Sequence, residues 1–297
     1  MMSQPSPEKQ KVIDFYEQYG WSREAEGTYK DTAKFEDLRP VTEEYRYKCH
    51  LRVNRYLHKG GRFLLDVASG AIPHPEYLTY SEGYAYRVCA DIAHNALSEA
   101  RKNLGEKGLY VQCDITHLPF RSESMDGCVS LHTIYHVPAD EQGDAFLELY
   151  RVLKPGMSGV VVYARGEHQG WLALLRLPYL MVKVFKKVLA KVRISRPQTG
   201  IGAEGTRGLY FHSHSNRWLE VHLKPFIDYQ IAVWRFFDPL LLKMYIHPFL
   251  FGKKILDIIY DLEEKWPEFM GKAGAHPMFI LRKSLPDAGQ KRQPQVK

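Results

Sequence analysis

Residues 62–71 read Arg-Phe-Leu-Leu-Asp-Val-Ala-Ser-Gly-Ala, a short apolar run that ends in an acid and continues into small residues. A run this short, without polar alternation, is typical of a strand that is buried on both faces of a sheet. The small residues after Asp66 let the backbone approach a ligand closely. This stretch therefore predicts a strand of a parallel α/β sheet with a binding loop directly after it.

The same pattern recurs along the chain. Apolar runs at 86–91, 109–114, 125–131 and 159–163 alternate with helical patterns at 95–103 and 141–153, and a further helical pattern at 41–57 precedes the first run. Later strands are expected at 226–237 and 277–282, with a helix at 249–266. Strands that alternate with helices form right-handed βαβ units. The sequence predicts an α/β fold: a Rossmann-like, mostly parallel sheet of about seven strands, with helices on both faces and a largely helical cap.

Three of the predicted strands end in an acid, namely Asp66, Asp91 and Asp114. In open α/β sheets, ligands bind at the carboxyl ends of the strands. A carboxylate there can accept hydrogen bonds from an ammonium group, from ribose hydroxyls or from an exocyclic amine. Taken singly, each acid could equally be a helix N-cap or a turn residue. No P-loop lysine follows the first run, which argues against a triphosphate ligand.

From Leu64 to Tyr163 the motifs resemble those of the class I S-adenosylmethionine-dependent methyltransferase family. Residues 65–70, Leu-Asp-Val-Ala-Ser-Gly, resemble the family's first motif. Asp91 with Ile92 and Asp114 with Ile115 match the next two motifs, and 118–120, 125–130 and 151–156 complete the set in register. The resemblance implies an enzyme that uses S-adenosyl-L-methionine as its cofactor.

The resemblance also implies roles for single residues. Asp66, Ala68, Ser69 and Gly70 would hold the methionine part of the cofactor, and Asp91 would bind the ribose hydroxyls. Ile92, Asp114 and Ile115 would border the adenine, and Leu131 is a further expected cofactor contact. Ala68 stands where the family motif usually has its first glycine. This departure leaves open an alternative, a catalytically degenerate fold that acts as a cofactor-binding or regulatory subunit.

The loop at 131–138 reads Leu-His-Thr-Ile-Tyr-His-Val-Pro. Methyl transfer from a sulfonium mainly requires alignment of the nucleophile, and an oxygen nucleophile also needs a base. A neutral imidazole can take a proton near pH 7, so His132 and His136 are the candidate catalytic residues, with a cofactor contact or a helix cap as the alternative role. Tyr135, Tyr210, His212 and His214 are the expected substrate-facing residues. The His-x-His pair lacks a third ligand nearby, so no metal site is predicted.

Residues 178–194 predict an amphipathic helix with a wholly basic polar face, including Lys183, Lys187 and Lys191. Two interpretations remain open: a cap helix packed on the core, or a helix on an anionic membrane surface that admits a lipid-linked acceptor. Nucleic acid is not an expected partner, because the basic run lacks interleaved exposed aromatic residues at a stacking surface and no RNA-binding module is visible in the sequence. The apolar, aromatic cap predicts a small-molecule, glycolipid or lipid-linked acceptor, with O-methylation as the expected reaction.

Five segments are expected. They are an N-terminal segment near the cofactor entrance (1–39), a cofactor-binding core (40–165), a helical cap insertion (166–224), C-terminal strands and a helix that complete the sheet and cap (225–284), and a disordered tail (285–297). Four scattered cysteines predict reduced thiols. Neither a signal peptide nor an apolar span of about 18 residues is evident. A cytoplasmic location is expected, with peripheral attachment to the inner membrane surface as the alternative.

Overall fold

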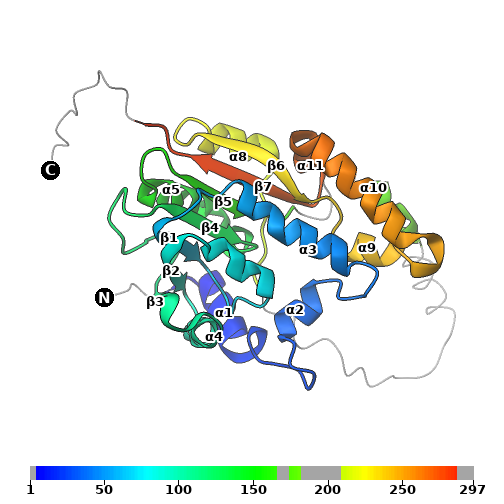
Figure 1. The fold of residues 1–297 in the computed structure, drawn as a ribbon, viewed down its shortest axis with the longest axis horizontal. Coiled ribbons are helices and arrows are strands. Elements are labelled where there is room, and N and C mark those ends of the chain that lie inside the picture. Colours follow the sequence, from blue (N-terminus) through cyan, green and yellow to red (C-terminus); the bar gives the residue numbers. More distant parts are fainter. Residues whose placement is uncertain (1–4, 166–173, 182–208, 286–297) are drawn as a thin grey trace.

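In the computed structural model, residues 5–165, 174–181 and 209–285 are described (Figure 1). Strands in these ranges form one seven-stranded sheet in the order β3-β2-β1-β4-β5-β7-β6. The bounds are β1 Gly61–Val67, β2 Tyr84–Asp91, β3 Gly108–Gln112, β4 Gly127–Leu131, β5 Ser158–Val162, β6 Tyr229–Arg235 and β7 His276–Arg282. The first five strands are parallel, and β7 runs antiparallel between β5 and β6. The predicted Rossmann-like fold class is confirmed.

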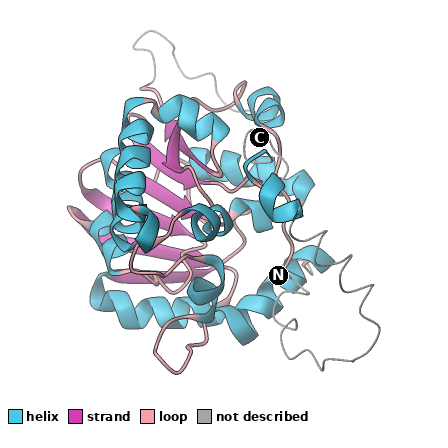
Figure 2. Cartoon of the chain, turned by 90° about the vertical axis from the view of Figure 1, so that its right-hand side faces the viewer, coloured by secondary structure: helices cyan, strands magenta, loops and turns pink. Residues whose placement is uncertain are grey.

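Helices cover both faces of the sheet (Figure 2). One face packs against α5 (Gln142–Val152) and α8 (Asn216–Leu223). The other packs against α3 (Glu43–Leu51), α4 (His94–Leu104) and α10 (Gly252–Lys265). Successive side chains of a strand point to opposite faces of the sheet. In β1, Leu64 packs on one face and Leu65 and Val67 on the other, so both faces are apolar and both are covered by helices.

The described part of the chain also contains α1 Pro7–Phe15, α2 Lys30–Phe35, α9 Pro239–Tyr245 and α11 Pro267–Ala273, and residues 177–181 are helical as well. The sequence analysis did not predict α1 and α2, because both are short and mostly polar. The start of α1 nevertheless carries a local signal. The hydroxyl of Ser6 accepts a hydrogen bond from the N–H of Lys9, and a proline occupies the first helical position.

Most boundaries differ from the predictions by one to three residues, but the helix predicted over 41–57 is α-helical only over Glu43–Leu51 and continues as a 3-10 turn over Arg52–Arg55. β3 ends at Gln112, two residues before Asp114, and β4 begins at Gly127, because Met125 makes only an isolated bridge with Leu153. The four cysteines are buried and unpaired. The basic helix predicted over 178–194 lies outside the described residues from 182 onward, as does the tail from 286. Within the described ranges, no helix combines the length and the apolar character needed to cross a bilayer.

Candidate functional site

A small cavity lies beyond the carboxyl ends of β1, β2 and β3. Its lining includes Ala68, Asp91, Ile92, Asp114, Ile115 and His136, all of which the sequence analysis had assigned to one site. Lys9 and Val12 of α1 line it from the opposite side. The cavity volume is about 50 Å³, which is room for one or two water molecules. The N-terminal segment therefore fills most of the space above the strand ends.

The loop after β1 has φ in the left-handed region at three residues, of which Ile72 (φ of 53°) is the last. Ala68 has φ of 51° and Gly70 has φ of 55°. Ala68 is held by a hydrogen bond from its N–H to the carbonyl of Ala90, at 2.6 Å. A left-handed alanine costs roughly 1–2 kcal/mol, which explains why glycine is the usual residue here. A Cβ on Gly70 would come within 2.4 Å of the Trp21 ring, so Trp21 covers this loop.

Asp91 is the best-defined carboxylate of the site. It is 7% exposed. Its two oxygens accept hydrogen bonds from the N–H groups of Gly70, at 3.0 Å, and Ala93, at 2.9 Å. Burial raises the pKa of Asp91 to about 6, although these two hydrogen bonds oppose the shift. The side chain thus fixes the loop after β1 to the end of β2 and retains lone pairs for a ligand.

Asp114 is already engaged by a cation from another part of the chain. The ammonium group of Lys9 lies 2.5 Å from its Oδ2 and also contacts the carboxylate of Glu141. The N–H and hydroxyl of Thr116 donate to Oδ1, each at 2.9 Å. Burial favours the neutral acid, but the hydrogen bonds from Lys9 and Thr116 outweigh it and lower the pKa of Asp114. A ligand that uses Asp114 must therefore share Oδ2 with Lys9 or displace it.

Asp66 is placed apart from the cavity lining. Its Oδ2 accepts hydrogen bonds from Nη2 and Nε of Arg87, at 2.6 and 2.9 Å, in a pair that is almost fully buried. Arg87 also donates to the carbonyl of Tyr77. Burial raises the pKa of Asp66 despite the neighbouring guanidinium. In this structure Asp66 joins β1, β2 and the segment after β1.

The two candidate catalytic histidines face different surroundings. The Nδ1 of His136 lies 2.7 Å from the carbonyl of Tyr210, so it donates this bond and leaves Nε2 for another partner. Burial lowers the pKa of His136 to about 4. His132 has φ of 60°, and its ring packs against Trp234 and His276 with centroid distances of 4.4 and 5.2 Å. Burial, with a smaller contribution from Arg235, lowers the pKa of His132 to about 3.

The residues predicted to face the substrate lie together along 210–214 and beside Tyr135. The N–H of His212 donates to the carbonyl of Tyr135, at 2.8 Å. The hydroxyl of Tyr210 accepts from the N–H of Ala139, at 3.1 Å. The ring of His214 stacks on Trp218 at 3.5 Å between centroids. These contacts attach residues 210–214 to the loop that follows β4.

Several residues at this edge of the sheet were missed by the sequence analysis. Lys9 and Trp21 come from the N-terminal segment, and Trp234, Arg235 and His276 come from β6 and β7. Of these, Arg235 carried a readable signal, since a charged residue at the end of an apolar strand needs a buried partner or a ligand. The others are brought here by contacts between distant segments. A local pattern could not have identified them.

Comparisons with known proteins match this chain to methyltransferases. A family model described as a methyltransferase domain matches residues 65–161. The chain is 30% identical over 185 residues to the biotin biosynthesis bifunctional protein BioHC of Teredinibacter turnerae, covering 52% of this chain and 29% of that protein. It is 29% identical over 151 residues to 24-methylenesterol C-methyltransferase 2 of Arabidopsis thaliana, covering 49% of this chain and 39% of that one. The chain thus spans less than half the length of these relatives.

Among solved structures, the DhpI–SAH complex matches with a TM-score of 0.55 at 12% identity, covering 96% of this chain and all of that chain. At this level of identity the match describes the fold, and it extends the shared architecture beyond residues 65–161 to nearly the whole chain.

Proposed function

Residues 65–161 belong to the class I S-adenosylmethionine-dependent methyltransferase family, and we propose that the chain transfers a methyl group from S-adenosylmethionine to a small apolar acceptor. The observation that carries this proposal is that Asp91 and Asp114 line one cavity beyond the ends of adjacent strands. Ligands of open α/β sheets bind at this edge, close to where the strand order reverses between β1 and β4.

For the cofactor we propose the following contacts. Asp91 accepts hydrogen bonds from the ribose hydroxyls, and Asp114 accepts one from the adenine amine with Ile92 and Ile115 against the ring. The loop of Ala68, Ser69 and Gly70 holds the methionine part, supported from below by Asp66 and bordered by Leu131. Because Lys9 and Val12 of α1 line this cavity of about 50 Å³, we propose that α1 shifts when a nucleoside binds.

For the transfer itself the chain must align the acceptor with the methyl carbon, since the reaction is an in-line displacement. We propose His136 as the proton acceptor in an O-methylation, because it lines the cavity and its Nε2 is left for another partner. With a pKa of about 4, this histidine is neutral at pH 7 but weakly basic. It therefore suits an acceptor hydroxyl that is itself acidic, such as a phenol or an enol. His132 would instead support the loop through its packing on Trp234.

The proposed acceptor is a small apolar molecule or a lipid-linked one, with Tyr135, Tyr210, His212 and His214 on its side of the site. The sterol methyltransferase among the relatives supports this class. So does the turn before α10, where Phe249 is 95% exposed and Phe251 71% exposed. Exposed aromatic side chains followed by lysines, here Lys253 and Lys254, are typical of surfaces that meet a bilayer. We therefore include peripheral membrane contact in the proposal.

Two experiments test the proposed function. Isothermal titration with S-adenosylhomocysteine should give binding in the micromolar range, on the order of −8 kcal/mol. Incubation with methyl-labelled cofactor and with lipid and aqueous cell extracts should then label an extractable small molecule. Binding without any labelled product would favour the alternative, a regulatory fold that retains the cofactor. The left-handed Ala68 is the observation behind that alternative. The absence of binding would refute both.

A further inference from the structure

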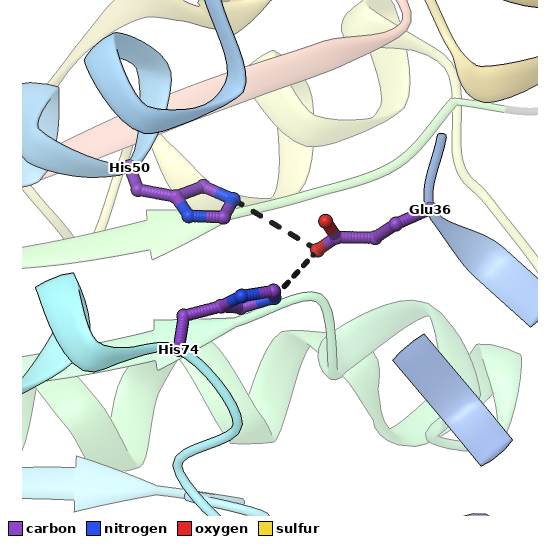
Figure 3. Close-up of side chains that lie close together, drawn as sticks. All are labelled: Glu36, His50 and His74. Carbon is purple, nitrogen blue, oxygen red and sulfur yellow. Dashed lines mark hydrogen bonds and ion pairs between the residues drawn. The ribbon is translucent and has the colours of Figure 1, made fainter. Parts of the chain in front are cut away.

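A second cluster of titratable side chains lies between α2, α3 and the η3 turn (Pro75–Ser81), as Figure 3 shows. Glu36 directly follows α2, His50 belongs to α3, and His74 directly precedes η3. The Oε1 atom of Glu36 is 3.0 Å from Nε2 of His74 and 3.8 Å from Nε2 of His50. One ligand atom from each residue lies within 4.8 Å of the other two. His50 is fully buried, and the other two side chains are about nine-tenths buried.

Two hydrogen-bond acceptors face each other in this cluster, Nε2 of His50 and Oε1 of Glu36. Its Nδ1 lies 2.5 Å from Oε1 of Glu76. An ionised carboxylate can only accept, so Nδ1 carries the hydrogen, and Nε2 of the neutral ring is a lone pair. That lone pair faces Oε1 of Glu36, and among the described residues Nε2 has no hydrogen-bond partner. Nε2 of His74 donates a hydrogen bond to the same Oε1 at 3.0 Å, so of these two facing acceptors only the lone pair of His50 is left without a partner within the described ranges. A cation that took the place of the His74 proton would be bound by all three groups at once.

Each of the facing groups is also held in place from behind. Glu76 fixes the tautomer and orientation of His50, and the ring of Trp234 stacks on the same imidazole at 17° between planes. The second oxygen of Glu36 lies 3.6 Å from Nε of Arg46, an ion pair in which neither atom has a hydrogen-bond partner among the described residues. Metal-binding histidines and carboxylates typically have such outer partners.

We propose that Glu36, His50 and His74 bind a divalent transition-metal ion, through Nε2 of each histidine and one oxygen of Glu36. Two imidazole nitrogens and a carboxylate suit Zn²⁺ or Fe²⁺. Metal–ligand bonds of about 2.0–2.1 Å in a tetrahedral site separate the ligand atoms by about 3.3 Å. The observed separations from Glu36 to the two histidines, 3.0 and 3.8 Å, bracket that value, and all three ligand atoms lie within 4.8 Å of one another. Side-chain adjustments would have to bring all three pairs to that separation.

Three protein ligands leave a coordination position for water or for an oxygen atom of a bound molecule. The ion would also join three segments that are 14 and 24 residues apart in the chain (36 to 50 and 50 to 74). This spacing explains why no local motif indicated the site. The proposal goes beyond methyl transfer and does not depend on it, because metal binding is measured without cofactor or acceptor.

The test uses the full chain after removal of metal with a chelator. Titration with Co²⁺ should give one equivalent bound, with the visible absorption bands of tetrahedral cobalt, and Zn²⁺ should displace it and raise the melting temperature. Glu36→Gln and His74→Gln should each weaken binding by at least about tenfold. His222→Gln is the matched control, because His222 is exposed on α8 and bonds only to its own helix. It should bind as the wild type does.

The variant His74→Cys distinguishes the loss of a metal ligand from a failure to fold. It replaces a nitrogen ligand by a thiolate, so Co²⁺ should still bind and should gain sulfur-to-cobalt charge-transfer absorption. The proposal is overturned if the chelator-treated wild type binds no stoichiometric Co²⁺ or Zn²⁺. It is equally overturned if a folded His74→Gln variant binds as tightly as the wild type. Titration of S-adenosylhomocysteine into the same samples tests the proposed function separately.

Discussion

Replacement of Asp91 by asparagine is the most direct perturbation of the proposed cofactor site. The carboxylate now accepts one hydrogen bond from Gly70 and one from Ala93, one on each oxygen. An asparagine keeps only one acceptor oxygen, so its amide group would face one of these N–H donors and leave it unpaired. That loss costs about 1–3 kcal/mol of folding stability. A hydrogen bond from a ribose hydroxyl to a charged oxygen contributes a further 1.5–3 kcal/mol or so, which the variant loses on binding.

At about 1.4 kcal/mol per factor of ten, the loss on binding corresponds to a Kd that rises roughly tenfold to a hundredfold. Isothermal titration of S-adenosylhomocysteine into both proteins measures it, and circular dichroism verifies that the variant is folded. Glu106→Gln is the matched control, because it removes one exposed acid beyond the far end of α4. A folded Asp91→Asn variant that binds within about threefold of the wild type would refute the assignment of Asp91 to the ribose.

The raised pKa of Asp91 predicts that cofactor affinity depends on pH. Burial raises the pKa of Asp91 from 3.8 to about 6, so the carboxyl gains a proton as the pH falls through 6. The protonated form offers one acceptor fewer to the cofactor. Affinity should therefore be constant above about pH 7 and should decrease as the pH falls below about 6. The decrease should be absent in Asp91→Asn, and titrations from about pH 5 to about pH 8 would measure both profiles.

Three further perturbations follow from the geometry. Arg87→Met leaves Asp66 as an unpaired buried charge, so urea unfolding should show a loss of about 3–5 kcal/mol, whereas the exposed Arg121→Met should change little. Ala68→Gly removes the strain of a left-handed alanine, and this gain exceeds the entropic cost of a glycine. The free energy of unfolding should therefore rise by up to about 1 kcal/mol, measured as a higher melting temperature. A lower melting temperature would contradict the assigned strain. Lys9→Met frees Asp114 from its cation, so S-adenosylhomocysteine should bind up to about tenfold more tightly. Weaker binding would mean that Lys9 contacts the cofactor.

The strands and the residues at their ends were predictable from the sequence because their signals are local. A buried parallel strand reads as a short apolar run, and the acids Asp91 and Asp114 follow such runs directly. Parallel strands all present their carboxyl ends at the same edge of the sheet, so the topology alone brings these acids together. This is why Ala68, Asp91, Asp114 and His136 were assigned to one site before their contacts were known.

The partners of these residues were not predictable, because each comes from a distant segment. Lys9 reaches Asp114 across 105 positions of the sequence. Arg87 lies 21 positions from Asp66, and its position inside an apolar strand was the one available sign of a buried ion pair. Trp21 covers Gly70 through ring packing, which has no sequence periodicity. The sequence therefore identified the acids but gave no information about which cations neutralise them.

The N-terminal segment connects the two proposed sites. Lys9 lines the cofactor cavity, Trp21 covers Gly70 beside it, and Glu36, which follows α2 in the same segment, belongs to the proposed metal site. A metal ion bound to Glu36 would anchor the end of this segment to α3 and η3, while the proposed shift of α1 would admit a nucleoside. The part that moves would then be α1 (residues 7–15). The measured cofactor affinity would be the intrinsic affinity multiplied by the fraction of molecules in which that part has withdrawn. Metal binding should therefore change cofactor affinity only to the extent that it changes this fraction, and titrations of S-adenosylhomocysteine with and without bound Zn²⁺ would measure the coupling.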